Sequence, residues 1–277
     1  MKIGLLVIAT DKYSRFIEPL YRSMKKYFLK KHKVTMFVFT DKNLAPEKDQ
    51  KVIYLLHKPW PFITLNRYAI FNQHKKELSK FDYLFYIDAD MLFTGPVNRE
   101  ILEETVGVAH PAYYGSSREK YPFESDRRST AYIGSNEGKT YFIGSFIGGS
   151  GKSFLNMSRI LSQKIKQDKK NRIIAIWHDE SHLNRYFIDR PPKKVLDPGY
   201  SYFEDIRSSF KKRISALDKG NDFKKDNTKK FVRLRDFDWE TYLRLNPELR
   251  KNWNSKIRAG IHYLFFGRRE GRFVGRK

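Results

Sequence analysis

Apolar and polar residues along the first 90 positions form blocks whose lengths match short buried strands and amphipathic helices. Mostly apolar runs with the length of a buried strand lie at residues 3–9, 34–39, 52–56 and, apart from Asp88, at 83–89. Apolar residues have helical spacing from Ser14 to about Lys31, and a second helix is expected from about Thr64 to Ser79. The order strand, helix, strand, strand, helix, strand predicts a three-layer α/β domain with a mostly parallel sheet.

The second half of the chain continues this pattern and then changes character. Residues 152–170 have the spacing of an amphipathic helix, and the apolar run that begins at Ile173 leads into another helix. A polar and basic stretch from about Asp226 to Asp236 is typical of a linker. We therefore predict a first domain over residues 1–228 and a small helical module over 237–277. A module of about 40 residues is marginal for independent stability, so we expect it to dock on the first domain or on a partner.

Length and composition restrict the kind of protein. A chain of 277 residues with 40% hydrophobic residues can bury the core of one α/β domain and a small appendage. The absence of cysteine excludes disulfides, thiolate metal sites and a cysteine nucleophile. The first apolar run has only about seven residues, too few for a signal peptide or a membrane span. We expect a soluble, cytoplasmic protein without a transmembrane segment.

The charge of the chain introduces a second class of function. The formal net charge is +24, and residues 207–277 contain 21 Lys and Arg against 8 Asp and Glu. Such an excess attracts anions, so nucleic acid, an anionic membrane and a phosphorylated or acidic glycan are all candidate partners. Aromatic residues next to basic ones, as at Phe265 and Arg268, would also suit nucleic acid, although core and surface residues give the same pattern. Binding of nucleic acid or an anionic surface through the C-terminal quarter is the alternative to an enzyme.

Two carboxylates at the end of the fourth apolar run are the first chemical signal. Asp88 and Asp90 are separated by one residue, so on an extended chain their side chains face the same way. Unpaired carboxylates are costly to bury, and oxygen ligands are those that hard divalent cations prefer. Open α/β sheets bind ligands at the carboxyl ends of their strands, where this pair is expected. The alternative is a pair of solvated aspartates in the turn before Gly95.

A second candidate lies in the block Tyr141–Ser150, where small residues alternate with large ones. The small residues, which would let a ligand approach the backbone closely, are Gly144, Ser145, Gly148 and Gly149. A tightly packed strand and turn would show the same alternation. The sequence contains neither Gly-x-Gly-x-x-Gly nor a Walker loop, so any nucleotide must be held by other means.

A third candidate is a cluster of polar residues that follows the apolar run from Ile173. It consists of His178, Asp179, Glu180 and His182. A zinc site is a weak interpretation, because these residues do not form the His-Glu-x-x-His pattern. Acidic residues at a helix start, stabilised by the helix dipole, are the simpler interpretation.

Four longer blocks together resemble glycosyltransferase family 6, which includes the histo-blood-group A and B transferases and the α-1,3-galactosyltransferases. The blocks are Phe81–Met91, His110–Tyr132, Tyr141–Ser150 and Trp177–Tyr186, in family order and at similar spacing over about residues 1–228. The strings Tyr-Gly-Ser-Ser-Arg-Glu and Trp-His-Asp-Glu-Ser-His-Leu-Asn are long and specific. The resemblance implies a single nucleotide-sugar-binding domain of the GT-A type. It also implies transfer of galactose or N-acetylgalactosamine from UDP to a galactoside, with an α-1,3 linkage and retention of configuration.

The resemblance assigns roles to residues of the donor site. Asp88 and Asp90 match the pair that holds Mn²⁺, or another divalent cation, and the diphosphate. Tyr13 matches the residue that packs on uracil, and Ile8 and Ala9 line the same site. Some bacterial relatives have asparagines in place of the aspartates and work without metal. Because this chain has both carboxylates, we expect it to use a metal.

The resemblance also assigns the residues around the reacting sugar. Arg67 and Asp179 match groups that hold the donor sugar, and Glu180 matches the carboxylate beside the anomeric carbon. Retention needs either a covalent intermediate on Glu180 or an ion pair that Glu180 stabilises, and the sequence does not distinguish them. His110 and Trp177 match acceptor contacts, which Glu180 also makes.

Two parts of the chain depart from the family pattern. Ile143 and Ser145, on either side of Gly144, occupy positions that tune donor choice, and Ser145 is small but polar, so UDP-Gal and UDP-GalNAc both remain open. Lys219 and Lys225 have the spacing of the basic residues that close over the diphosphate, within a tail whose resemblance is thin. A solvated basic run is the alternative for these two lysines.

The C-terminal module resembles a short unit that is often attached to carbohydrate-active proteins. Its pattern runs from Tyr-Leu-x-x-Asn-Pro-Glu-Leu to Glu-Gly-Arg, over residues 242–272. Two small helices are expected to pack through Trp239, Tyr242, Leu243, Leu249, Trp253, Ile257 and Tyr263. The family resemblance favours the transferase and implies no specific nucleic-acid partner, while weak contact of the basic C-terminus with an anionic surface stays open.

Overall fold

The computed structural model of the chain describes residues 1–206, 209–217, 237–245, 249, 259–260, 262–263 and 275–276. The chain divides into two compact units, Met1–Leu217 and Asp218–Lys277. Lys219, Lys225, Trp253, Ile257 and the aromatic-basic stretch around Phe265 lie outside the described residues. The predictions that concern them, including the alternative of nucleic-acid binding, therefore stay predictions.

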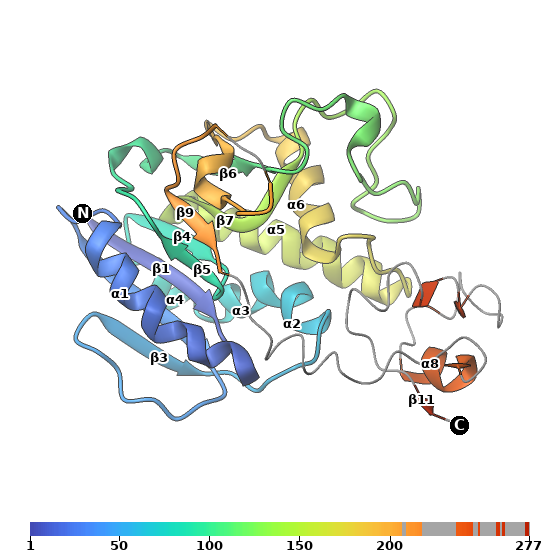
Figure 1. Cartoon of the computed structure of the whole chain (residues 1–277), viewed down its shortest axis with the longest axis horizontal. Helices are drawn as coiled ribbons and strands as arrows, with labels where there is room; N and C mark the ends of the chain where they lie inside the picture. The colour runs from blue at the N-terminus through green and yellow to red at the C-terminus, as the bar shows by residue number, and fades with distance from the viewer. Residues whose placement is uncertain are drawn as a thin grey trace. The chain divides into compact units, whose positions relative to one another are not determined.

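The first unit is built on one seven-stranded sheet with the order β3-β2-β1-β4-β7-β6-β8 (Figure 1). The strands are β1 (Lys2–Ile8), β2 (Lys33–Thr40), β3 (Gln50–Tyr54), β4 (Tyr83–Ile87), β6 (Thr105–Ala109), β7 (Phe142–Ser150) and β8 (Lys194–Leu196). All neighbouring pairs are parallel except the two that β7 makes, with β4 and with β6. The predicted α/β fold with a mostly parallel sheet is confirmed.

Helices cover both faces of this sheet, which gives the predicted three layers (Figure 1). The helices are η1 (Asp11–Phe16), α1 (Ile17–Tyr27), α2 (Phe62–Leu65), α3 (Arg67–Gln73), α4 (Lys75–Leu78), η2 (Arg99–Ile101), η3 (Arg118–Lys120), α5 (Gly151–Lys170), α6 (His178–Asp189) and η4 (Pro198–Ser201). A short antiparallel pair, β5 (Met91–Phe93) and β9 (Ile214–Ala216), packs beside α1.

Neighbouring residues of β4 show how the two faces are filled. The ring of Phe85 contacts Phe28, just after α1, while the ring of Tyr86 contacts Phe71 of α3. Successive strand residues point to opposite faces, so α1 and α3 lie on opposite sides of the sheet. Phe71 in turn packs on Phe154 of α5, which extends this second layer.

The single helix expected over 64–79 is wrong in one respect, because the structure breaks it into α2, α3 and α4. The breaks fall at Asn66 and His74, where ψ is −6° and 15°. The Asn66 side chain donates to the carbonyl of Phe62 at 2.6 Å and accepts from Lys169 at 2.9 Å. Asparagine competes with the helical backbone in this way, which apolar spacing does not show.

The topology creates a switch point at the carboxyl edge of the sheet. From β1 the chain moves outward through β2 and β3, and then returns to place β4 on the other side of β1. The parallel strands β1, β2 and β4 end at the same edge, at Ile8, Thr40 and Ile87. The crevice between strands that diverge in this way is the usual ligand site of open α/β sheets.

The described part of the second unit has a small core of its own. It contains β10 (Phe237–Asp238), paired antiparallel with β11 (Gly275–Arg276), and the helix α8 (Trp239–Leu245). Its buried residues are Tyr242, Leu243, Leu249, Ala259 and Tyr263, with Trp239 packed against them. The hydroxyl of Tyr242 lies 2.8 Å from Nδ1 of His262, so this core also satisfies a buried polar pair. None of the helices in the described ranges is long and apolar enough to span a bilayer.

Candidate active site

Asp88 and Asp90 lie directly after β4, at the switch point, as the sequence predicts. The Asp88 amide donates to the carbonyl of Ser145 at 2.9 Å, which joins this turn to β7. Its Oδ1 accepts from the Tyr86 hydroxyl at 2.5 Å. Leu217 donates its amide to the Asp90 carbonyl at 2.8 Å. Both aspartates are partly exposed, so neither carboxylate is sealed inside the core.

Arg67, the first residue of α3, connects the candidate residues of three different elements. Its Nη1 donates to the Gly144 carbonyl at 2.9 Å, and its Nη2 lies 3.4 Å from Asp88 Oδ1. Its Nε lies 3.0 Å from Asp179 Oδ2 on α6, and its guanidinium covers the Tyr86 ring at 4.2 Å. The buried Arg67 therefore connects a carboxylate that follows β4 with a carboxylate of α6 through one charge.

The contact between Arg67 and Asp179 is ionic but not a hydrogen bond. Although the two atoms are 3.0 Å apart, Arg67 Nε and Asp179 Oδ2 are both buried without a hydrogen-bond partner among the described residues. Native proteins rarely leave such atoms unsatisfied. Their capacity to donate and accept is thus available to a polar ligand, which suits the hydroxyl groups of a sugar.

The electrostatics of this group follow from burial. Burial raises the pKa of Asp179 to about 6, and the nearby charge of Arg67 opposes that rise. Burial also disfavours the charged form of Arg67, but the Asp179 carboxylate and the other nearby groups outweigh it and raise its pKa above the ordinary value. Arg67 is therefore a permanent cation in the centre of the site.

Glu180, next to Asp179 on α6, is held by two hydrogen bonds from β7 and its approach. Its Oε1 accepts from the Tyr141 hydroxyl at 3.0 Å, and its Oε2 accepts from the Gly144 amide at 2.8 Å. Burial raises the pKa of Glu180 to about 7, while the two donors act in the opposite direction. The side chain is still partly open to solvent. An oriented carboxylate that titrates near neutral pH is typical of catalytic sites.

Residues at the start of α6 have unusual backbone and surface features. His178 has φ 53°, in the left-handed region that residues other than glycine rarely adopt. Its ring meets the Trp60 ring edge-to-face at 4.5 Å. The preceding Trp177 is 42% exposed, which is uncommon for so large an aromatic side chain. Strained backbone of this kind is concentrated at functional sites.

His110 follows β6 and packs against Tyr141, the residue that donates to Glu180. Its ring contacts the rings of Tyr113 at 4.8 Å and Tyr141 at 5.5 Å. Its Nδ1 lies 3.1 Å from the Ala112 amide, which donates to it. Burial lowers the pKa of His110 to about 4, so the imidazole is neutral at pH 7 and its Nε2 carries the proton.

The remaining predicted donor residues lie at the end of β1, in η1 and on β7. Ile8 ends β1, Ala9 follows it with its amide bonded to the Phe39 carbonyl, and Tyr13 lies in η1. Ile143 is buried on β7, where it pairs with Val108. The buried Ser145 hydroxyl lies 2.8 Å from that of Ser201 in η4.

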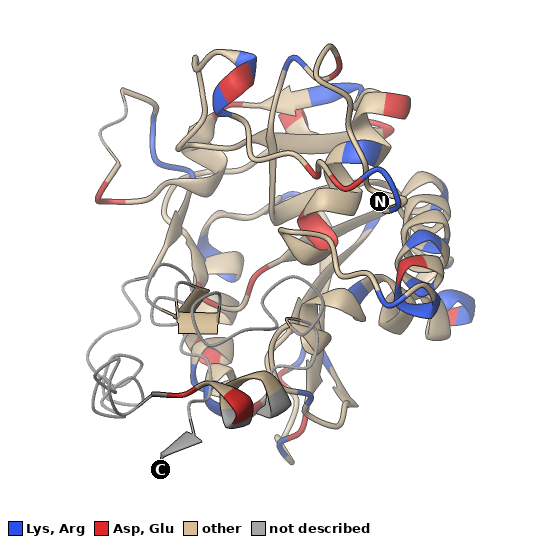
Figure 2. Cartoon of the chain, turned by 90° about the vertical axis from the view of Figure 1, so that its right-hand side faces the viewer, with Lys and Arg blue, Asp and Glu red and all other residues tan. Residues whose placement is uncertain are grey.

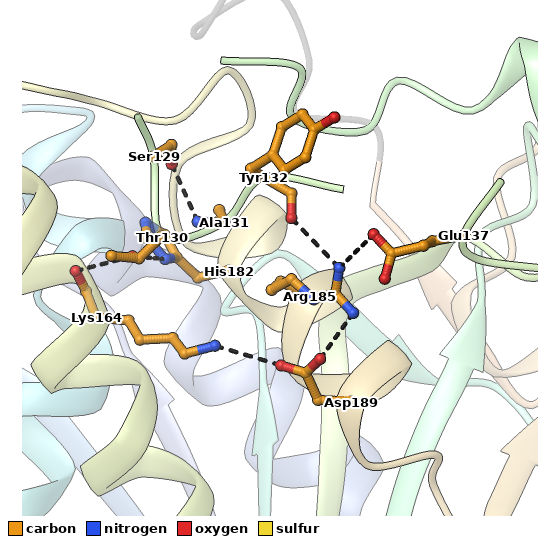
Figure 3. Close-up of polar contacts among 9 residues, drawn as sticks. All are labelled: Ser129, Thr130, Ala131, Tyr132, Glu137, Lys164, His182, Arg185 and Asp189. Atoms are coloured by element: carbon orange, nitrogen blue, oxygen red, sulfur yellow. Dashed lines mark hydrogen bonds and ion pairs between the residues drawn. The ribbon is translucent and has the colours of Figure 1, made fainter. Parts of the chain in front are cut away.

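His178 and His182, the close histidine pair of the sequence, do not belong to a cluster of three possible metal ligands among the described residues. His182 is buried one helical turn after His178 on α6, where its Nε2 lies 3.6 Å from Asp168 and its Nδ1 lies 3.5 Å from the Thr130 hydroxyl. Figure 3 shows His182 and Thr130 together with Arg185, which donates to Glu137 at 2.9 Å and to Asp189 at 2.7 Å. These contacts attach α6 to the segment 129–137 and to α5, so they stabilise the helix that carries Asp179 and Glu180.

A divalent cation would find oxygen ligands at the switch point but would need more of them. Asp88 and Asp90 supply carboxylates, the ligand type that Mg²⁺ and Mn²⁺ prefer. Within the described residues, no three His, Asp or Glu side chains converge as a metal-binding group. The residues therefore fit a metal whose coordination is completed by oxygens of a bound diphosphate and water.

Several residues of this site carry no assigned role in the sequence prediction. They are Tyr86, Tyr141, Asn184 and Ser201, each hydrogen-bonded to a candidate residue or to its strand. The alternation of strand residues could have indicated Tyr86, which lies two positions before Asp88. No local pattern indicates the other three, because their partners are distant in sequence.

Comparison with known proteins decides the family. The model of glycosyltransferase family 6 matches residues 1–228 of the chain. The chain belongs to glycosyltransferase family 6. The α/β domain with its mostly parallel sheet is accordingly a GT-A-like domain.

Named relatives of this family 6 chain come from vertebrates and bacteria. Over 210 residues it is 35% identical to globoside alpha-1,3-N-acetylgalactosaminyltransferase 1 of Homo sapiens, covering 72% of this chain and 60% of that protein. It is 35% identical over 214 residues to histo-blood group ABO system transferase 1 of Rattus norvegicus, covering 74% and 62%. It is 29% identical over 235 residues to the O-antigen biosynthesis glycosyltransferase WbnI of Escherichia coli, covering 83% and 100%. The chain thus spans 60–62% of these two vertebrate relatives.

Proposed function

We propose that this family 6 chain is a metal-dependent retaining hexosyltransferase. It would move galactose or N-acetylgalactosamine from a UDP-sugar to a galactoside-type glycan and form an α-1,3 linkage. The observation that carries the proposal is the convergence on Arg67 of Asp88, from the switch point, and Asp179, from the helix of Glu180. The names of the relatives, which are α-1,3-N-acetylgalactosaminyltransferases and ABO transferases, support the same class of reaction.

The donor nucleotide would bind at the carboxyl ends of β1 and β4. Ile8, Ala9 and Tyr13 follow or end β1 and would surround the uracil ring, while Asp88 and Asp90 after β4 would hold the diphosphate through Mn²⁺ or another divalent cation. A divalent cation at this point offsets the charge that develops on the leaving UDP. Lys219 and Lys225 are proposed to add positive charge over the diphosphate.

The donor sugar would lie between Arg67, Asp179 and Glu180. The unsatisfied Arg67 Nε and Asp179 Oδ2 would bond its hydroxyl groups. Ile143, Gly144 and Ser145 of β7 would border its C2 substituent. The Ser145 hydroxyl is paired with that of Ser201. The proposal covers donors with either a hydroxyl or an N-acetyl group at C2.

Glu180 is proposed as the catalytic carboxylate. In one route an oxygen of Glu180 attacks C1, and the C1–O bond to the β-phosphate breaks with its electron pair leaving on UDP. The acceptor oxygen then displaces Glu180 from C1 and gives its proton to an oxygen of the departed diphosphate. In the other route the ionised Glu180 stabilises the oxocarbenium ion while the acceptor attacks from the face that UDP leaves, giving its proton to the phosphate oxygen. Both routes need Glu180 as an anion, which its two hydrogen-bond donors favour.

The acceptor glycan would be held by His110 and Trp177, beside Glu180. The neutral His110 has an N–H at Nε2 that can donate to a sugar hydroxyl. The exposed Trp177 offers an apolar face on which a sugar ring can pack.

The proposal is tested by release of UDP from UDP-Gal and from UDP-GalNAc by the full chain with and without Mn²⁺. We expect release only with the metal, and a loss of about 100-fold or more in Glu180→Gln. Glu103→Gln, which changes an exposed glutamate, is the matched control and should keep full activity. Mass spectrometry of the intact protein mixed with donor separates the two routes, because only the first adds a hexose to Glu180. Undiminished turnover in Glu180→Gln would contradict the catalytic role of Glu180. UDP binding of equal affinity with and without Mn²⁺ would contradict the role of the metal.

A further inference from the structure

Among the described residues, Tyr141 is the one side chain outside the assigned site residues with a hydrogen bond to the Glu180 carboxylate. Its hydroxyl donates to Oε1 at 3.0 Å, while the amide of Gly144, three residues later, donates to Oε2 at 2.8 Å. The two oxygens of one carboxylate are therefore held from two points of the same segment. Two such donors fix both the position and the plane of the carboxyl group.

The segment that carries both donors is itself attached to α6. The Asn184 side chain, one helical turn after Glu180, accepts from the Phe142 amide at 2.8 Å and donates to the Phe142 carbonyl at 2.9 Å. It also lies within bonding distance of the Glu180 carbonyl, at 3.0 Å. The Asn184 side chain thus fixes the distance between β7 and α6 next to Tyr141. Neither element has to move for the Tyr141 hydroxyl to reach Glu180.

The Tyr141 ring is held in place by other aromatic side chains. It is buried, and ring contacts connect it to Tyr113 at 5.2 Å, Phe123 at 5.3 Å, His110 at 5.5 Å and Tyr121 at 6.2 Å. The carbonyl of Tyr141 also accepts from the His110 amide at 2.8 Å. A ring packed on several sides cannot turn away, so its hydroxyl is a fixed donor and not an occasional one.

We propose that Tyr141 is a positioning residue for the transfer reaction, whose hydroxyl keeps the Glu180 carboxylate ionised and aimed at the anomeric carbon. The inference rests on the proposed role of Glu180. A hydroxyl donor stabilises a carboxylate anion more than the corresponding acid, so loss of the donor favours protonation. Burial raises the pKa of the Tyr141 phenol itself, which keeps it in the donating form at every working pH.

Other groups near Glu180 also affect its pKa, and they are the same in the wild type and in Tyr141→Phe. Asp179 favours protonation of Glu180, and Arg67 and the Gly144 amide oppose it. Tyr113 and Tyr68 are also titratable neighbours of Glu180 in the described part of the chain, and burial raises the pKa of each, so both are neutral. Removal of the Tyr141 hydroxyl alone therefore removes one hydrogen-bond donor and raises the pKa of Glu180.

The test compares Tyr141→Phe with Tyr121→Phe in the full chain. Each change removes one hydroxyl from the same aromatic cluster, but the Tyr121 hydroxyl bonds to the carbonyls of Ser116 and Lys139, away from Glu180. For UDP release from the better donor with Mn²⁺, we expect the acid limb of the kcat–pH profile to move up by about one pH unit in Tyr141→Phe. We also expect kcat to fall about tenfold at pH 7 with KM for the donor nearly unchanged. Tyr121→Phe should match the wild type.

A second measurement does not depend on activity. Titration of ¹³C-labelled glutamate side chains by NMR, without metal, gives the pKa of Glu180, whose signal is identified by its absence in Glu180→Gln. We expect this pKa to be higher in Tyr141→Phe than in the wild type and unchanged in Tyr121→Phe. Equal pKa values in Tyr141→Phe and wild type would overturn the inference whether or not the chain transfers sugar. If the pKa of Glu180 is higher in Tyr141→Phe but the wild type releases no UDP, the hydrogen bond is established and only the proposed function fails.

Discussion

Glu180→Gln should stabilise the fold at alkaline pH even though it removes the proposed catalytic group. Burial raises the pKa of Glu180 from 4.5 to about 7 in the folded chain. A pKa that is higher in the folded than in the unfolded state means that stability is lost as pH rises from about 4.5 to about 7. Above pH 7 the folded protein carries the full cost of a buried anion.

The magnitude follows from the difference between the two states. A difference of about 2.5 in pKa corresponds to about 3 kcal/mol of unfolding free energy. Because Glu180 is partly open to solvent, screening reduces this, and we expect a gain of about 1–2 kcal/mol at pH 8. Glutamine fits the site, since its oxygen can accept from Gly144 and its amide can donate to the oxygen of the Tyr141 hydroxyl.

Urea unfolding of the full chain at pH 5 and pH 8, followed by circular dichroism, measures this effect. At pH 5 the wild type and Glu180→Gln should differ by less than about 1 kcal/mol, because Glu180 is mostly protonated in the folded state there. The difference should grow at pH 8. Glu103→Gln, an exposed change of the same chemistry, should show no such pH dependence. Equal unfolding free energies of the wild type and Glu180→Gln at both pH values would refute the idea that burial destabilises the ionised Glu180.

Three further changes test other parts of the site and the sheet. Gly148→Ala should lower unfolding free energy by about 1–3 kcal/mol in urea titrations, because the new Cβ would lie 2.1 Å from Cδ1 of Phe85. Arg67→Lys keeps the charge but loses the fork that reaches the Gly144 carbonyl, so kcat for UDP release should fall at least tenfold, and an unchanged kcat would contradict its bridging role. Asp90→Asn should remove the Mn²⁺ dependence of UDP binding in calorimetry, and retained dependence would exclude it as a ligand.

The excess of basic residues, with a formal net charge of +24, favours anionic partners of a different class. Figure 2 shows Lys and Arg carried by helices, strands and loops of the chain, with acidic residues among them. Several of the basic side chains form ion pairs, as Arg22 does with Glu18 and Lys212 with Glu204. The most basic quarter of the sequence lies mostly outside the described residues, so its contact with an anionic surface stays a prediction.

Local patterns in the chain were sufficient for the layer architecture and for part of the site. Apolar runs and helical spacing depend on neighbours a few positions apart, so the strands and α5 could be recognised within a few residues. The same holds for Asp88 and Asp90, whose common direction follows from strand geometry and whose location at a strand end follows from the order of elements.

Tertiary structure alone decided how these residues cooperate. Arg67 and Gly144 are 77 positions apart, and Tyr141 and Glu180 are 39 apart, so no window of sequence contains either contact. The break in the helix at Asn66 also depends on Lys169, on a distant helix. Burial of Asp179 and Glu180 raises their pKa values only because β7, α3 and α6 meet at one edge of the sheet. Ionisation and orientation are properties of that meeting point, because desolvation and hydrogen bonding depend on everything that surrounds a group in space.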